Sequence, residues 1–251
     1  MQRYFVQPDQ MTDETVTITG ENIKHISKVM RMGPGDQVIC SDNQGRVAEC
    51  TITEITDASV HLSISEWIGV KSELPISVTI AQGLPKHDKL EMIVQKGTEL
   101  GADRFIPFQA SRSIVKWDSN KSKKKTERLH KIIKEAAEQS HRNRMPECLE
   151  PVTFDKLISL SDSFTTKIVA YEEQAKRNET TRLARLLQNV DIEQDSIIVV
   201  IGPEGGLTED EIQCLRGAGF VACGFGPRIL RTETASLYVL SAVSYQLELL
   251  R

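Results

Sequence analysis

Short apolar runs alternate with segments of helical periodicity from about residue 76 onward, and this alternation constrains the fold most strongly. Ser196–Ile201 is apolar after its first residue, which is typical of a strand buried on both faces of a sheet. Such alternation predicts a parallel sheet with helices on both faces, and therefore an α/β domain. The other expected strands are Ile76–Gln82, Arg104–Phe108 and Lys167–Tyr171, and the expected helices are Asp88–Leu100, Lys123–His141, Thr180–Leu187 and Thr208–Gly217.

The first 72 residues have a different pattern, with short alternating strands between turn signals. Closely spaced strands of this kind predict a small β-barrel. One helix is expected from Glu21 to Met32, and its basic residues recur every three or four positions on one face. Two domains are therefore expected, residues 1–72 and 73–251. The expected strands of the first are Val16–Thr19, Gln37–Cys40, Val47–Ile55 and Ser59–Ile64.

The charge of the chain is unevenly distributed. The formal net charge is −4, yet the segment Arg112–Arg144 holds 11 Lys/Arg and 4 Asp/Glu. A basic segment on an acidic chain is typical of a protein that meets phosphates at one place, which favours nucleic acid as a partner. A solvated helix face with a flexible loop would give the same charge run.

The segment Ala235–Leu250 is expected to be a helix whose apolar residues nearly encircle it. A helix that is apolar all round must be buried, and a single sheet face covers only one stripe of it. A second copy of the chain could cover the remainder. A homodimer is therefore predicted.

Several classes of protein are disfavoured by the sequence. No run of about 18 apolar residues is present, and the first residues do not resemble a secretory signal, so no membrane association is expected. Five cysteines without a C-x-x-C pair indicate reduced thiols and a cytoplasmic location. The scattered histidines show no metal-binding spacing, and no metal is expected.

The segment Gly202–Thr208 follows the buried strand and contains three glycines, while Thr208 and Glu211 form the pattern of a helix capping box. Open α/β sheets bind ligands beyond the carboxyl ends of their strands, and glycines let the backbone approach a ligand closely. A tight turn without a ligand explains the same spacing. Neither G-x-x-x-x-G-K-[ST] nor G-x-G-x-x-G is present, so known nucleotide loops are not supported.

A second glycine segment, Gly224–Ala235, leads through Arg228 and Arg231 into the last helix. Thr232 is expected to cap that helix with its hydroxyl, and Glu233 lies where the helix dipole favours an acid. Fixed guanidinium groups beside such a loop suit a phosphate or a developing oxyanion.

The two glycine segments together resemble the signature of the RsmE family, ribosomal RNA small-subunit methyltransferases of the SPOUT superfamily. Gln95–Gly101 resembles the family's K-x-x-E-L-G helix, and Glu135–Ser140, followed by Arg142 and Pro146, resembles its E-A-x-E-Q segment. His25–Arg31, followed by Gly35-Asp36, resembles its RNA-binding domain, with Met30 where leucine is common. The resemblance covers essentially the whole chain.

This resemblance implies a SPOUT-type C-terminal domain with a deep trefoil knot, a PUA-like N-terminal β-barrel and a homodimer. It implies transfer of a methyl group from S-adenosylmethionine, giving S-adenosylhomocysteine and N3-methyluridine at position 1498 of 16S rRNA, with the assembled small ribosomal subunit as substrate. A non-catalytic RNA-binding or ribosome-assembly factor, and a 2′-O-ribose methyltransferase of the same fold, remain alternatives.

The expected site residues follow from the motifs and the resemblance. Arg231 is expected to stabilise charge during catalysis, with Glu172, Glu204, Glu233 or water as proton acceptor. The expected cofactor-binding residues are Tyr171, Ile201, Gly202, Pro203, Glu204, Gly205, Gly206, Phe225, Gly226, Ile229, Leu230, Thr232, Glu233 and Ala235. The expected RNA-binding residues are Arg3, Lys24, Lys28, Arg31, Arg112, Lys123, Lys124, Lys125, Arg142, Arg144 and Arg228.

Overall fold

The structure, a computed structural model, describes residues 1–69, 72–173 and 181–250. Contacts between residues divide the chain into two compact units. Unit 1 consists of Met1–Glu73 and Lys134–Met145, and unit 2 consists of Leu74–Ile133 and Pro146–Arg251. The segment Lys134–Met145 thus joins unit 1 although it is distant from residues 1–73 in the sequence.

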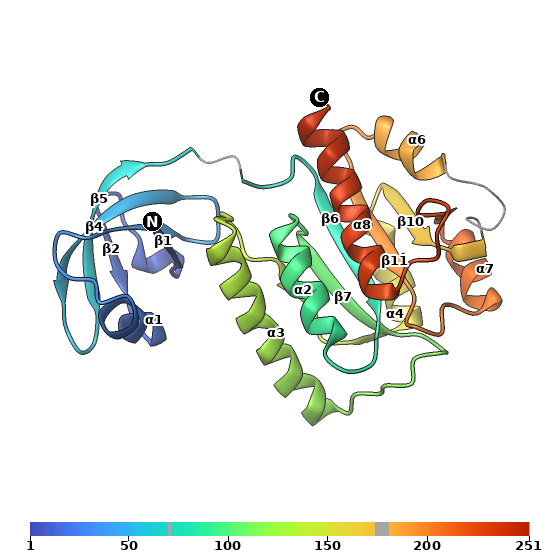
Figure 1. The fold of residues 1–251 in the computed structure, drawn as a ribbon, viewed down its shortest axis with the longest axis horizontal. Coiled ribbons are helices and arrows are strands. Elements are labelled where there is room, and N and C mark those ends of the chain that lie inside the picture. Colours follow the sequence, from blue (N-terminus) through green and yellow to red (C-terminus); the bar gives the residue numbers. More distant parts are fainter. Residues whose placement is uncertain (70–71, 174–180, 251) are drawn as a thin grey trace. The chain divides into compact units, whose positions relative to one another are not determined.

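Unit 1 is built on a curled five-stranded sheet, a half-barrel, in the order β1-β3-β4-β5-β2 (Figure 1). β1 and β3 are parallel, and the remaining pairs are antiparallel. The four strands expected from the alternating pattern are confirmed, whereas β1 was not predicted. The strands are β1 (Gln2–Phe5), β2 (Thr15–Ile18), β3 (Gln37–Ser41), β4 (Val47–Ile55) and β5 (Val60–Trp67).

A short helical segment closes the core of unit 1. The α-helix α1 spans only Glu21–Lys24 and continues as a π-helical turn, His25–Val29, so the expected regular helix to Met32 is shorter and partly π-helical. Ile26 is fully buried in this segment, among the apolar side chains of the sheet. Burial of one side of the segment leaves its basic side chains on the surface.

The returning segment Lys134–Met145 is fastened to unit 1 by buried polar contacts. Arg3 Nη1 donates to Arg142 O and to Asn143 Oδ1, both at 2.8 Å. The Glu73 carboxylate accepts hydrogen bonds from the Arg142 guanidinium and from Asn143 N, the latter at 2.8 Å. Arg3 and Arg142 are 2% and 3% exposed. Both were expected to bind RNA, and the structure places them inside unit 1 instead.

Unit 2 contains a parallel sheet in the order β12-β10-β11-β6-β7-β8, with β9 pairing β7 beyond this path. All of its strand pairings are parallel, and β11, the expected buried strand, lies in its interior. The short strands β8, β9 and β12 were not predicted. The strands are β6 (Ser77–Gly83), β7 (Arg104–Gln109), β8 (Glu147–Cys148), β9 (Val152–Thr153), β10 (Thr166–Ala170), β11 (Ser196–Ile201) and β12 (Val221–Cys223).

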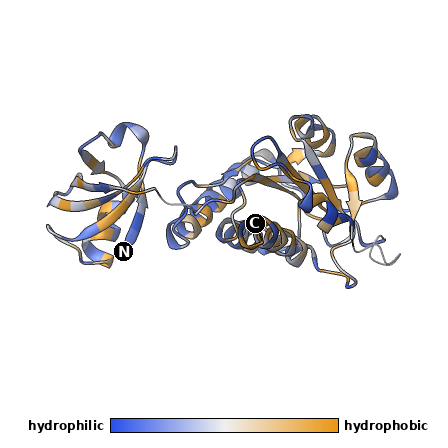
Figure 2. Cartoon of the chain, turned by 90° about the horizontal axis from the view of Figure 1, so that it is seen from above, coloured by the Kyte–Doolittle hydropathy of each residue, from blue (hydrophilic) through white to orange (hydrophobic). Residues whose placement is uncertain are grey.

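Helices cover both faces of this sheet, which confirms the expected α/β architecture (Figure 2). Helices α2 (Lys89–Glu99) and α8 (Thr232–Ser244) pack against each other on one face (Figure 1). Helices α4 (Phe154–Leu160) and α7 (Glu209–Gly217) share an apolar cluster with alternate residues of β11, so they cover the other face. The remaining α-helices in the described part of this region are α3 (Ser119–Gln139) and α6 (Arg182–Gln188).

The last helix is confirmed but shifted. It begins at Thr232, three residues before the expected start, and continues from Ser244 into a π-helical turn, Tyr245–Leu249. Tyr238, Tyr245 and Leu249 remain exposed along it in the single chain. No helix of the described residues is long and apolar enough to cross a membrane.

Candidate active site

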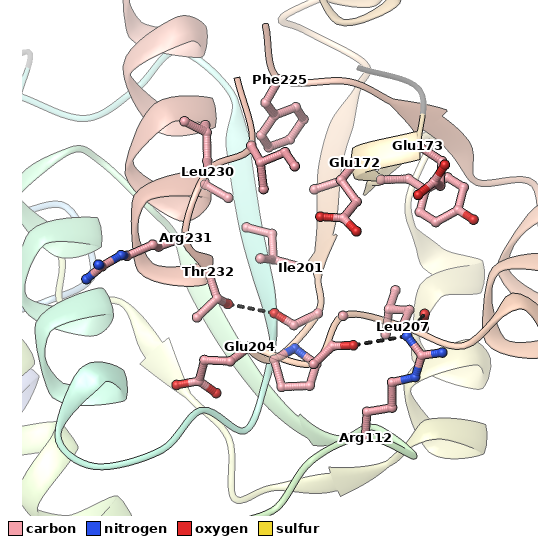
Figure 3. Close-up of a pocket in the computed structure, with 18 of the residues that line it drawn as sticks. Arg112, Glu172, Glu173, Ile201, Glu204, Leu207, Phe225, Leu230, Arg231 and Thr232 are labelled. Carbon is pink, nitrogen blue, oxygen red and sulfur yellow. Dashed lines mark hydrogen bonds between the residues drawn. The ribbon is translucent and has the colours of Figure 1, made fainter. Parts of the chain in front are cut away.

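A pocket of about 650 Å³ lies in unit 2 at the carboxyl edge of the parallel sheet (Figure 3). Its walls come from the segments that follow four strands: Arg112 after β7, Tyr171–Glu173 after β10, Gly202–Leu207 after β11, and Phe225–Thr232 after β12. Carboxyl ends of parallel strands are where open α/β sheets bind ligands. The two glycine segments singled out in the sequence therefore meet at one cavity.

A directed chain of hydrogen bonds joins the two segments beneath this cavity. Ser236 Oγ donates to Gln82 Oε1 at 2.8 Å, Gln82 Nε2 donates to Thr232 Oγ1 at 2.8 Å, and Thr232 Oγ1 donates to Gly202 O at 2.6 Å. The expected N-cap role of Thr232 is therefore wrong. Arg231 is the N-cap residue of α8, without a side-chain cap, and the Thr232 hydroxyl is used to bridge the two segments.

Gln82 was not selected from the sequence. It is the second-last residue of β6, and its side chain is fully buried with both amide atoms bonded. A buried polar side chain is costly unless it is paired, so a polar residue at the end of a buried strand was the available signal. The next residue, Gly83, has no room for a side chain, because an added Cβ would lie 2.6 Å from Pro203 Cδ.

The first glycine segment is also fixed from its other side. The expected capping box is confirmed: the Thr208 side chain accepts from Glu211 N at 3.2 Å, and Glu211 Oε2 accepts from Thr208 N at 2.8 Å. Arg112 Nη1 donates to Gly205 O at 3.1 Å and to Leu207 O at 3.4 Å. Arg112, expected to contact RNA, thus supports the loop in the structure.

Glu204 is held on the side of the pocket nearest α2. Its carboxylate accepts from Lys86 N at 3.1 Å and pairs with Lys89 Nζ at 3.0 Å, and the same ammonium lies 3.2 Å from Glu233 Oε2. Partial burial raises the pKa of Glu204, but hydrogen bonds from its own backbone N–H and from Lys89 outweigh this and lower the pKa overall. The hydrogen bond to Glu204 raises the pKa of Lys89.

The segment after β10 supplies different carboxylates. Tyr171 Oη donates to Glu209 Oε2 at 2.9 Å, and partial burial together with this carboxylate raises the pKa of Tyr171. The neighbouring Glu172 is exposed and directs its carboxylate toward the middle of the pocket (Figure 3). Among the expected proton acceptors, Glu172 therefore faces the cavity, whereas Glu204 and Glu233 face Lys89.

Most expected cofactor-binding residues line the pocket, and two, Gly226 and Glu233, do not. The expected catalytic residue Arg231 is exposed at its margin, with its guanidinium turned away from the other labelled side chains (Figure 3). Arg228 is also exposed in the lining. The lining residues that sequence reasoning missed are Lys89, Ala170, Glu173 and Glu209, whereas Leu207 belongs to the first glycine segment.

The other expected RNA-binding residues lie on the surface. Lys24, Lys28 and Arg31 are exposed on the helical segment of unit 1, and Arg144 is exposed at the end of the returning segment. In α3, Lys123 and Lys124 are exposed, and Lys125 Nζ lies over the Trp117 ring, 4.9 Å from its centroid. Among the described residues, no group of three or more His, Cys, Asp or Glu side chains could hold a metal ion.

Comparison with known proteins assigns the family. Residues 72–244 match an RNA methyltransferase domain, and residues 18–65 match an RNA methyltransferase PUA domain. The chain is 51% identical to ribosomal RNA small subunit methyltransferase E of Bacillus subtilis strain 168 over 254 aligned positions, which cover all of this chain and 99% of that protein. The chain belongs to the ribosomal RNA small subunit methyltransferase E family.

Solved structures of this family have the same fold. The ribosomal RNA small subunit methyltransferase E of Neisseria gonorrhoeae, bound to S-adenosyl methionine, is 28% identical, covers 97% of both chains and superposes with a TM-score of 0.84. A putative methyltransferase of Legionella pneumophila, in complex with the same cofactor, is 28% identical, covers 96% of both chains and has a TM-score of 0.82. The family resemblance stated from the glycine motifs is thereby confirmed.

Proposed function

We propose that this protein transfers the methyl group of S-adenosylmethionine to N3 of a uridine in 16S rRNA, at position 1498 of that RNA, within the assembled small ribosomal subunit. The observation that carries the proposal is the joining of two glycine segments around one pocket by the Thr232–Gly202 hydrogen bond. The two structural relatives described above are complexes with S-adenosylmethionine, which supports the same cofactor here.

The pocket residues suit that cofactor. The volume of about 650 Å³ lies within the roughly 300–1,000 Å³ of small-molecule sites. Apolar side chains such as Ile201, Leu207 and Phe225 alternate in its lining with glycine backbone, which offers hydrogen-bonding groups without side chains. In our proposal the chain that leads into α8 passes through a loop of unit 2 to reach the pocket, and this threading forms a deep trefoil knot.

The proposed chemistry needs a proton acceptor and a stabilised anion, because N3 of a neutral uracil carries a proton. The bound sulfonium supplies the methyl electrophile. Glu172 is the preferred proton acceptor, since its carboxylate faces the cavity, while the lowered pKa of Glu204 makes that group a weaker base (Figure 3). Arg231, with Arg228 as the second candidate, would stabilise the charge that develops on the uracil oxygens.

Exposed side chains on the two units suggest RNA and a second copy of the chain as partners. We assign RNA contacts to the exposed basic residues Lys24, Lys28 and Arg31 of unit 1, and to the basic start of α3. The exposed apolar side chains of α8 would be covered by a second copy of the chain in a cytoplasmic homodimer.

The deciding experiment is methylation of small ribosomal subunits from a strain that lacks this modification, followed by mass mapping of the modified nucleoside. We expect one N3-methyluridine per subunit. A methyl group on a ribose 2′-oxygen would replace our proposal with the 2′-O-ribose alternative. Binding of subunits without saturable uptake of labelled S-adenosylmethionine would identify a non-catalytic RNA-binding factor.

A further inference from the structure

Lys89, the first residue of α2, contacts a carboxylate from each of the two segments that enclose the pocket. Its Nζ lies 3.0 Å from Glu204 Oε1, in the first glycine segment, and 3.2 Å from Glu233 Oε2, in the first turn of α8. These charged contacts join the same two segments as the neutral chain through Gln82. The pocket is therefore closed by one neutral connection and one ionic connection.

We infer that Lys89 is a positioning residue for methyl transfer. Its ammonium holds the first glycine segment and the start of α8 together, and it keeps the carboxylates of Glu204 and Glu233 directed at this contact. The inference rests on the proposed function, because it assigns a purpose to the closure of the cofactor pocket. Glu204 supports it by its further partner: Lys86 N donates to both carboxylate oxygens, at 3.1 and 3.3 Å. A carboxylate that is held in this way is directed at the lysine and not at a substrate.

The arrangement differs from an ordinary surface ion pair, which contributes little to stability. Two carboxylates share a single ammonium, and the Glu233 side chain is only 11% exposed. Removal of the lysine would leave the two carboxylates without the ammonium that they share, and neighbouring like charges raise the pKa of one member. The lysine should therefore control both the spacing and the ionisation of the two carboxylates.

Other charged groups flank this cluster on both sides. Lys86, His87 and Asp88 lie on the turn before α2, and Arg231 precedes Glu233 at the start of α8. These groups are present in the wild-type protein and in every variant compared below. Their own titration therefore cancels when the pH dependence of binding in a variant is compared with that of wild type. In the wild-type protein Glu204 is ionised at neutral pH, and its lowered pKa extends the ion pair with Lys89 to more acidic pH, so that the pair breaks only when the pH falls through that lowered value.

The test is the pH dependence of S-adenosylmethionine affinity in Lys89→Met, measured by calorimetry at pH 8 and pH 5.5. At pH 8 we expect a dissociation constant about 5- to 10-fold above wild type, which corresponds to a change of about 1–1.4 kcal/mol in the free energy of binding. At pH 5.5 we expect the difference to shrink, because protonation of one carboxylate relieves the repulsion. A residue that only supports the fold would weaken binding equally at both pH values.

Two further variants isolate the cause. Lys89→Met/Glu233→Gln removes one of the two carboxylate charges that pair with Lys89 in the wild-type protein, and it should abolish the added pH dependence. Lys96→Met removes a lysine of the same helix that pairs with Glu99 outside the pocket, and it should bind like wild type.

The inference is overturned if Lys89→Met binds like wild type at pH 8, or if its defect does not change with pH. Thermal unfolding of the ligand-free proteins gives an independent readout, since the melting temperature of Lys89→Met should approach that of wild type as the pH falls. If wild-type protein takes up no S-adenosylmethionine, the proposed function fails by itself. The unfolding comparison then still decides whether Lys89 controls the two carboxylates.

Discussion

Two arginines of unit 1, Arg3 and Arg142, and two arginines of the pocket in unit 2, Arg228 and Arg231, have opposite environments. Arg3 and Arg142 are buried, and their guanidinium groups bind the backbone, an amide and the Glu73 carboxylate. Arg228 and Arg231 line the pocket and remain exposed. The same residue type therefore fastens a chain segment in unit 1 and lies exposed at a pocket in unit 2.

Burial with internal partners marks Arg3 and Arg142 as structural, whereas exposure alone does not make an arginine functional, since the exposed Arg112 supports the first glycine segment. A buried guanidinium without partners would be costly, so its partners must be present in the folded chain. An exposed guanidinium beside a pocket has no such requirement. Substitutions in the two sets should consequently change different quantities, with stability altered in unit 1 and reaction rate altered at the pocket.

The largest expected effect is on stability, from Arg142→Met. Removal of Arg142 leaves the Glu73 carboxylate without its main counter-charge, and because Glu73 is 27% exposed we expect a cost of about 3 kcal/mol, the lower end of the range for buried pairs. Denaturant unfolding can be followed separately in each unit, because the two tryptophans, Trp67 and Trp117, lie in different units. In a Trp117→Phe background, the Trp67 signal should shift to lower denaturant.

A matched control separates this effect from removal of charge alone. Arg144 is exposed, and its backbone N–H donates to Glu73 Oε1 at 3.2 Å, a hydrogen bond that does not need the side chain. Arg144→Met should therefore unfold like wild type. Arg142→Met/Glu73→Gln should regain part of the lost stability, because the unpaired charge is gone. Equal stability of Arg142→Met and wild type would remove the distinction between the two sets of arginines.

The next effect is on rate, from Arg231→Ala. Removal of a donor that stabilises a developing oxyanion costs at least about 100-fold in rate, equivalent to about 2.7 kcal/mol. Because Arg231 is exposed, its replacement should leave unfolding and S-adenosylmethionine binding unchanged. Single-turnover methylation of small ribosomal subunits measures the rate, and Arg228→Ala should have a smaller effect. An unchanged rate in Arg231→Ala would remove this residue from the proposed mechanism.

Sequence reasoning predicted the parts of the fold that depend on local pattern. The alternation of strands and helices, the buried strand Ser196–Ile201 and the Thr208–Glu211 capping box are all visible in neighbouring residues, and all are confirmed. The shortest strands were missed, since Val221–Cys223 is too short to show a period.

Contacts between distant residues could not be predicted in this way. The structural use of Arg3 depends on Asn143, which lies 140 positions away, and the bridge from Gln82 to Thr232 spans 150 positions. Thr232 was expected to cap its own helix because local chemistry allows it, but a buried amide and a carbonyl from other segments use the hydroxyl instead. The sequence therefore located the residues of the pocket more readily than the partners that hold them.

Gln82→Leu tests those long-range partners and should have an intermediate effect. The variant removes the centre of the hydrogen-bond chain and leaves the buried Ser236 hydroxyl without this acceptor, at a cost of about 1–3 kcal/mol. Since the chain positions Gly202, S-adenosylmethionine affinity should fall together with stability, unlike the effect of Arg231→Ala. Calorimetry and thermal unfolding of the same samples provide the comparison. A decrease in stability with unchanged affinity would show that the chain supports only the fold.

The smallest effect is expected from the three consecutive lysines near the start of α3, of which Lys123 and Lys124 are exposed and Lys125 is partly exposed. Replacement of Lys123, Lys124 and Lys125 by glutamine should reduce the slope of log binding constant against log salt by about 0.7–0.9 for each phosphate that is no longer neutralised. Stability should hardly change, because these side chains lack the buried partners of Arg3 and Arg142, although glutamine at position 125 cannot replace the cation over the Trp117 ring.

The control is Lys156→Gln/Arg185→Gln, which removes two exposed cations elsewhere on unit 2 and should leave the slope unchanged. Equal slopes for the α3 variant and wild type would show that the three lysines belong to a solvated helix face. The RNA contacts would then be assigned to the helical segment of unit 1 alone.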